Sequence, residues 1–184
     1  MSSNSWNQTL ISAQIAGSAL TAAAAASALP PAAKFTFPAN QLKIGDILHV
    51  RATGIISCVV TTPGTARFDL RFGSTVIFDS GAMNLNVIAK TNVPWWLEVL
   101  LTCRSIGAGT SATFWGQGQW QSEAVIGSPL PSAGGNGSLN IPVSGVAIST
   151  GFDSTVSNVI DSFFTQTVAT GSMTLEQFEL MYDL

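Results

Sequence analysis

Apolar and polar residues alternate through most of the chain after Lys34, and this period of two constrains the fold more than any other feature. In the segment Ala66–Phe72, four apolar side chains alternate with Arg67, Asp69 and Arg71. Such alternation is typical of a β-strand with one buried face and one polar face. The same period recurs in three longer segments, Asp46–Ser57, Trp95–Ile106 and Ser111–Glu123.

Shorter strand-like runs complete the pattern. They are expected at Thr75–Phe78, Ala82–Ile88, Val156–Val168 and Met173–Tyr182. Because about eight to ten strands follow one another without helical segments between them, we predict an all-β fold, an antiparallel jelly-roll-like β-sandwich. An uncharged stretch rich in glycine, proline and serine, Gly127–Gly151, interrupts the strands. Such a stretch is typical of a functional loop, a partner contact or disorder, and it could contain one more short strand at Val143–Ile148.

The first 33 residues contain no charged side chain and are rich in alanine. We therefore divide the chain into an N-terminal arm, residues 1–33, and a sandwich domain, residues 34–184. Alanine favours a helix, whereas Pro30 and Pro31 would end one, so we expect the arm to be extended or partly helical. Because an uncharged tail gains little from solvation, we expect neighbouring subunits to order it.

Two other interpretations of the arm are weaker. A membrane span is not predicted, because the apolar run is mostly alanine and contains several polar residues. A secretory signal would begin with a positive charge, which the chain lacks, although small residues before Lys34 imitate a cleavage site. A secreted enzyme with a sandwich fold would require that signal.

Composition excludes several classes of function. The chain of 184 residues carries 7 basic and 10 acidic side chains, a net charge of −3, which disfavours a nucleic-acid binder. His49 is the single histidine, so a histidine-based catalytic triad or zinc site is not expected. No carboxylate pair and no phosphate-binding glycine motif stands out. We therefore expect a protein that is not an enzyme and needs no cofactor or metal.

Two cysteines, Cys58 and Cys103, lie in strand-like runs. Cys103 shares the apolar phase of its strand, where a free thiol behaves as a small apolar side chain. We expect two buried thiols, with a disulfide in an oxidising compartment as the alternative.

Candidate subunit-contact residues fall into two groups. In the predicted arm they are Trp6, Leu10, Ile11 and Ile15. On the polar faces of predicted strands they are Trp96, Trp115, Gln117, Gln119 and Gln121. Tryptophan is enriched at protein contacts, and uncharged glutamines suit a hydrogen-bonded interface. The alternative is that these tryptophans stack on sugar rings.

Four segments resemble a group of small virion proteins of tailed bacteriophages. They are Phe35–Ile56, Thr61–Phe78, Thr91–Ser105 and Met173–Tyr182. The resemblance implies a jelly-roll-like subunit, commonly trimeric, that is assembled onto the phage particle in the host cytoplasm. It carries over no catalytic residue.

From the resemblance and the arm together, we expect a head decoration or cement protein. It would form a homo-oligomer, preferably a trimer, bind the major capsid protein and stabilise the shell, with no nucleic-acid or membrane partner. The alternative function is a tail or fibre receptor-binding module that recognises host glycan.

Overall fold

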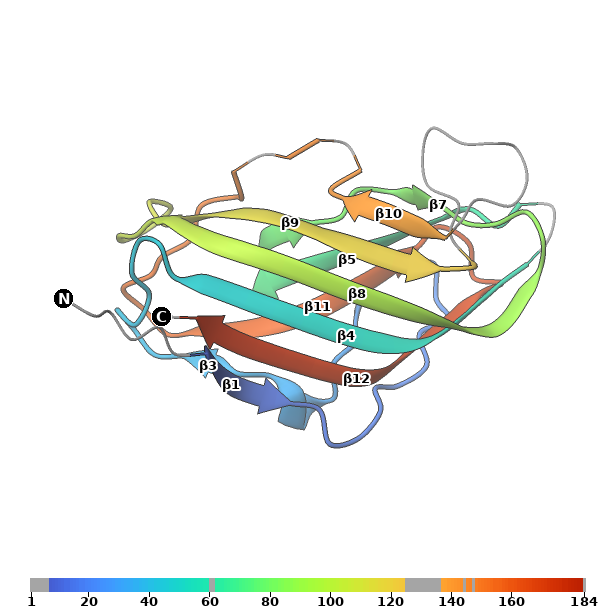
Figure 1. The fold of residues 1–184 in the computed structure, drawn as a ribbon, viewed down its shortest axis with the longest axis horizontal. Helices are drawn as coiled ribbons and strands as arrows, with labels where there is room; N and C mark the ends of the chain where they lie inside the picture. Colours follow the sequence, from blue (N-terminus) through green and yellow to red (C-terminus); the bar gives the residue numbers. More distant parts are fainter. Residues whose placement is uncertain (1–6, 60–61, 125–136, 144, 147, 184) are drawn as a thin grey trace.

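The computed structural model describes residues 7–59, 62–124, 137–143, 145–146 and 148–183, which form two antiparallel β-sheets packed face to face (Figure 1). The front sheet has the strand order β1-β12-β4-β8-β9-β10, and the back sheet has the order β2-β11-β5-β6. Two further short strands join the back layer, β3 beside β11 and β7 beside β5. The strands are β1 (Asn7–Ser12), β2 (Ala26–Ser27), β3 (Thr36–Phe37), β4 (Ile47–Cys58), β5 (Thr65–Phe72), β6 (Thr75–Asp79), β7 (Met83–Asn84), β8 (Lys90–Ser105), β9 (Thr113–Ser122), β10 (Ser138–Ile141), β11 (Asn158–Gln166) and β12 (Ser172–Asp183). The predicted all-β sandwich is confirmed.

The strands pair in a nested order. The innermost pair is β5 with β6, and around it β4 pairs with β8. Next, β2 and β3 pair with β11, and the outermost pair is β1 with β12. Successive pairs alternate between the back and the front sheet, which is the arrangement of a jelly roll. Strands β9 and β10 extend the front sheet beyond β8.

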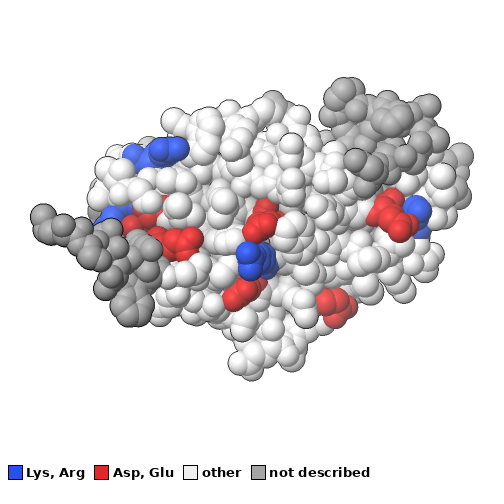
Figure 2. All heavy atoms as spheres, in the orientation of Figure 1, with Lys and Arg blue, Asp and Glu red and all other residues white. Residues whose placement is uncertain are grey.

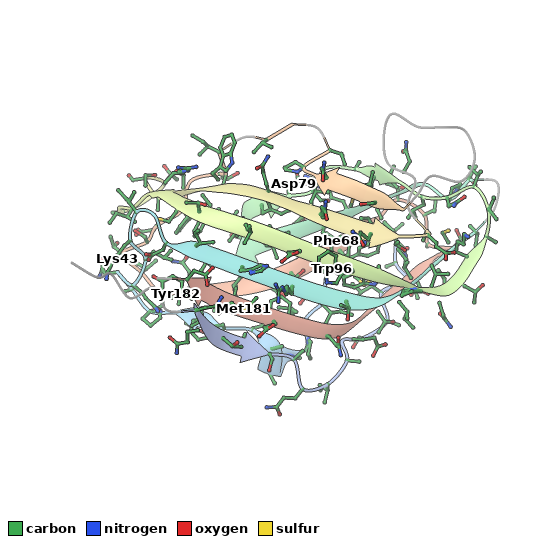
Figure 3. The ribbon with its side chains drawn as sticks, in the orientation of Figure 1. Lys43, Phe68, Asp79, Trp96, Met181 and Tyr182 are labelled. Carbon is green, nitrogen blue, oxygen red and sulfur yellow. The ribbon has the colours of Figure 1, made fainter. Side chains whose placement is uncertain are left out.

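The predicted alternation sets which side chains fill the core. The apolar positions of β5 and the odd-numbered positions from Trp95 to Cys103 on β8 are all at most 4% exposed. Phe68 lies at the centre between the sheets (Figure 3). Its ring centroid is 5.2 Å from that of Trp95 and 4.8 Å from that of Trp120, both on the front sheet, and 5.2 Å from that of Phe164 on the back sheet. The two sheets are therefore joined by aromatic contacts at their middle.

Residues 7–33 lie against the sandwich. After β1, the backbone N–H groups of Ala13, Gly17 and Leu20 each donate to carbonyls of the β12 segment at 2.8 Å. The chain then reaches the back sheet, where β2 pairs with β11. Because Ala28 and Leu29 are buried in the core, this part of the predicted arm is integral to the two sheets.

The described part of the arm is extended. Within residues 7–33 the one helical turn is a 3-10 turn, Pro31–Ala33. The helical option fails because hydrogen bonds to β12 and β11 satisfy the backbone, and these tertiary contacts override the helix propensity of alanine. Contacts within one chain thus hold these residues, and the ordering of the arm by neighbouring subunits stays a prediction.

The uncharged stretch Gly127–Gly151 lies partly outside the described residues. Its described part contains β10, which pairs with β9 over Ser138–Ile141, several residues before the strand expected at Val143–Ile148. Farther on, Ile148 makes a single bridge to Trp115. The expected strand Ala82–Ile88 is reduced to β7, two residues long.

Both cysteines are free and buried. In the register of β4 and β8, Cys58 pairs with Lys90 at one end, whereas Cys103 lies beyond Thr102, the partner of Ile47, at the other end. This separation along the strands is on the order of 40 Å, far beyond the reach of a disulfide. The expectation of two buried thiols is confirmed.

Candidate functional site

The predicted contact residues lie on two surfaces, apart from Trp6, which lies outside the described residues. The first surface is the edge segment, which we define as residues 7–20, and it includes Leu10, Ile11 and Ile15. The second is the outer face of the front sheet, which includes Trp96, Trp115 and the three glutamines. The structure therefore does not bring all the candidates into one site.

The edge segment forms one border of the front sheet. Its strand β1 is hydrogen-bonded to β12 on one side and is the last strand of the sheet on the other. Leu10 and Ile11 are half-buried against the core, whereas Ile15 projects outward with 64% of its surface exposed. A hollow beside the edge is lined by Ile11, Ile15, Pro30, Ala32 and Ala33, among others.

No charged residue and no proline occurs in the edge segment. Edge strands of soluble proteins usually carry lysine, proline or strong bulges that prevent pairing with another chain. This edge has one register shift, between Thr9 and Ile11, and otherwise none of these features. The edge strand β1 therefore lacks most of the features that usually protect a sheet edge.

On the outer face of the front sheet, the strand register places side chains in rows. One row runs across five strands and contains Gln177, Thr53, Trp96, Gln121 and Ser138. The neighbouring row contains Glu179, Arg51, Glu98, Gln119 and Asn140. Gln117 lies in a third row, opposite Leu100. Trp96 is half-buried near the middle of the sheet, and the three glutamines are exposed (Figure 3).

Four charged or ionisable groups, His49, Arg51, Glu98 and Glu179, lie together at the centre of this face. Glu98 Oε1 lies 2.5 Å from His49 Nε2 and accepts a hydrogen bond from Arg51 Nε at 3.2 Å. On the other side of Arg51, Glu179 accepts a hydrogen bond from the Thr9 hydroxyl at 2.8 Å. Figure 2 shows a basic group between two acidic groups at the centre of a face that is otherwise mostly uncharged.

Three shallow hollows lie on this face, and two of them border Trp96. One is lined by Trp96, Arg51, Thr53, Gln177 and Glu179, among others. A second, on the opposite side of the indole, includes Pro94, Gln121 and Glu123. A third lies beside Gln117 and Gln119 of β9. It is lined by these two residues and by Glu98, Leu100, Gly118, Asn140 and Ile141. Trp115 lines none of these three hollows.

The sequence did not identify the charged groups that lie near Trp96 on this face. His49, noted in the sequence only as the single histidine, pairs with Glu98. The positions of His49 and Arg51 in the polar phase of β4 were visible. That Glu98 lies beside them depends on the β4–β8 register, for which the sequence carried no signal.

The outer face of the back sheet carries a separate ionic network. Asp69, 3% exposed, contacts Arg71 at 2.5 Å and Arg67 at 3.3 Å. Arg67 also pairs with Asp79, and hydrogen bonding to this carboxylate raises the pKa of Arg67. These ion pairs neutralise one another and point to a structural role.

Two buried groups near the start of β4 have raised pKa values. Burial raises the pKa of the Cys103 thiol to about 11, with the Asp46 charge as a second cause. Burial also raises the pKa of Tyr182, whose hydroxyl donates a hydrogen bond to the Asp46 carboxylate. Both groups stay protonated near neutral pH.

No group of three histidine, cysteine, aspartate or glutamate side chains in the described part of the chain is placed to hold a metal ion. No helix within the described ranges is long and apolar enough to cross a membrane.

No protein-family model and no curated protein matches the chain. Among solved structures, the chain is similar to the CBM2 module of the evolved Dit of Lactobacillus casei BL23 phage J-1. The match is 13% identical, covers 80% of this chain and 67% of that chain, and has a TM-score of 0.30. At that TM-score the likeness supports no conclusion about function.

Proposed function

We propose that this chain is a structural protein of a tailed-phage virion, a head decoration protein that attaches to the capsid shell through its edge segment. The proposal joins the resemblance of four sequence segments to small virion proteins with the surface that the fold leaves unpaired. In this role the protein acts by binding, as a homo-oligomer, and catalyses no reaction.

The observation that carries the proposal is the uncharged edge of the front sheet. Within the described residues, β1 has no strand paired with it on the side away from β12, and an apolar hollow and the exposed Ile15 lie beside it. A strand of a neighbouring coat subunit that added to this edge would gain main-chain hydrogen bonds, and its apolar side chains could fill the hollow. Several such contacts on one oligomer would give high avidity from individually weak sites.

Deletion of the whole arm would not test this proposal, because the deletion would also remove β1, β2 and core residues such as Leu29. Single exposed residues provide a sharper test. The variants Gln14→Lys and Ile15→Lys each place a charge on the edge segment. Because the charge would lose its water when a strand is added, either variant should bind capsids at least about tenfold more weakly. The measurement is cosedimentation of the purified full chain with capsids of its phage that lack the protein.

Ile44→Lys is the matched control, because Ile44 is 66% exposed, about as much as Ile15, and lies outside the edge segment. It should bind capsids like the unmodified chain, and all three variants should keep the thermal midpoint. Normal binding by both edge variants would refute attachment through this edge. Absence of binding by the unmodified chain would refute the decoration role itself.

A further inference from the structure

A second surface, the outer face of the front sheet around Trp96, has a chemistry different from that of the edge segment. We propose that this face is a binding track for a neutral oligosaccharide, which lies across β12, β4, β8 and β9 and stacks one sugar ring on Trp96. The inference concerns a different activity from capsid attachment and does not depend on it.

The polar groups of the track match sugar hydroxyls. A hydroxyl both donates and accepts, and so does a side-chain amide. Among the described residues, the amides of Gln117 and Gln121 make no hydrogen bond to the protein, and both are exposed. Gln119 donates to Asn140 Oδ1 at 3.3 Å, which orients both amides along the row.

The central aromatic group provides an apolar contact. Trp96 is half-buried, so its ring is held by its neighbours while part of its surface stays accessible. Hollows lie on both sides of it, one toward Arg51 and Gln177 and one toward Gln121. The four strands of the track span a length of about 14 Å from the spacing between strands. That length suits an oligosaccharide of several residues.

The charges of the face favour a neutral ligand. Arg51 lies between two carboxylates, Glu98 and Glu179, and His49 contacts Glu98, so the basic groups at the centre of the track already have acidic neighbours. An anionic polysaccharide would be repelled by these carboxylates. Charge-assisted hydrogen bonds from neutral hydroxyls to the same carboxylates are favourable.

A protein partner fits this face less well. Cores of protein interfaces are depleted in charged residues and enriched in apolar area. Here charged groups occupy the centre, and among the described residues of β4, β8, β9 and β12 the one exposed large apolar side chain is Leu100, at 47%. The composition is that of a wet, polar binding surface.

The test begins with the full chain on an array of plant and microbial oligosaccharides that includes neutral and acidic members. Binding to neutral members is expected. Titration of a neutral array member that binds, followed by tryptophan fluorescence, then gives the dissociation constant. Trp96→Ala should raise that constant about tenfold or more, the loss typical of a central aromatic contact. Gln121→Ala should weaken binding to a smaller extent.

The matched control is Trp115→Ala, which removes a half-buried tryptophan from the same sheet face outside the three hollows. It should bind the oligosaccharide like the unmodified chain. Thermal midpoints identify any variant that fails to fold. If Trp96→Ala fails to fold, the dissociation constants of Trp96→Phe and Gln121→Ala test the proposal instead.

Three results would overturn the proposal: no binding to any neutral member, binding to acidic members alone, or equal binding by the unmodified chain and the Trp96 variants. Ile15→Lys separates the two proposals. It should keep sugar binding while it loses capsid binding, and Trp96→Ala should behave in the opposite way.

Discussion

Gly54 allows β4, β12 and Trp95 to pack closely, and replacing it by alanine should destabilise the sandwich. A Cβ atom at this position would lie 2.0 Å from the carbonyl oxygen of Thr174 on β12 and 2.8 Å from two atoms of the Trp95 indole. Favourable contacts between such atoms lie near 3.5 Å, so one strand must move by about 1 Å or more. The indole cannot easily yield, because Trp95 is 2% exposed and its Nε1 donates to the Ile55 carbonyl at 3.2 Å.

The size of the effect follows from this geometry. Overpacking a core costs about 1–3 kcal/mol, and a clash with backbone belongs at the upper end of that range. Alanine recovers about 0.5–1 kcal/mol, since it is less flexible than glycine in the unfolded chain. We therefore expect Gly54→Ala to lower the free energy of unfolding by about 2 kcal/mol. For a chain of this length the thermal midpoint should fall by about 4–8 °C.

Urea denaturation followed by tryptophan fluorescence, together with calorimetry, measures both quantities. Gly116→Ala is the comparison, because a Cβ there would meet the buried side chains of Leu101 and Phe78 at 2.6 Å rather than backbone. A side chain can shift without breaking the hydrogen bonds between two strands, so the loss should be smaller. If Gly54→Ala unfolds at the same urea concentration as the unmodified chain, or at a higher one, the close-approach argument is wrong.

Three further predictions concern buried polar groups. Asp161→Asn should lower the free energy of unfolding by about 1–2 kcal/mol and speed tryptic cleavage after Lys34. The reason is that Asp161 accepts a hydrogen bond from Ser27 at 2.8 Å and pairs with Lys34 at 2.5 Å. An unchanged cleavage rate would contradict this role. Cys58 and Cys103 should not react with a thiol reagent in the native protein and should give two thiols in denaturant, whereas rapid native reaction would show that they are accessible. The raised pKa of Cys103, about 11 against an ordinary 9.0, favours the protonated thiol in the folded state. The contribution of the protonated Cys103 thiol to the free energy of unfolding is therefore complete below pH 9. It decreases by about 2 kcal/mol between pH 9 and 11. Urea titrations at fixed pH should show that Cys103→Ala loses less stability than the unmodified chain across that range.

Much of the fold could be predicted because strand alternation is local. The phase of β5 identifies Phe68 as a core residue, and the phase of β8 separates buried Trp95 from accessible Trp96. Each assignment requires a few neighbouring residues and the geometry of one strand. Predictions of this kind were confirmed.

The arm and the candidate sites depended on long-range information. The alanine content of residues 1–33 suggested that part of the arm is helical. In the structure, backbone groups of this segment instead hydrogen-bond to β12 and β11, and helix propensity takes no account of such distant partners. Likewise, no feature of the segment around Trp96 indicates that Arg51 and Gln177 lie beside it, because both positions follow from strand order and register. Such partners become visible only when the whole sheet is assembled.

The nested pairing of strands has a consequence for how the protein is made. Thr9 and Glu179, which are hydrogen-bonded across the outermost pair, are 170 residues apart in sequence. During synthesis β1 leaves the ribosome first and has no partner until β12 has followed it. Folds dominated by such distant contacts form slowly, and strands that wait unpaired are exposed to aggregation. The uncharged N-terminal segment is therefore most exposed to aggregation during translation, before its own last strand arrives to cover it.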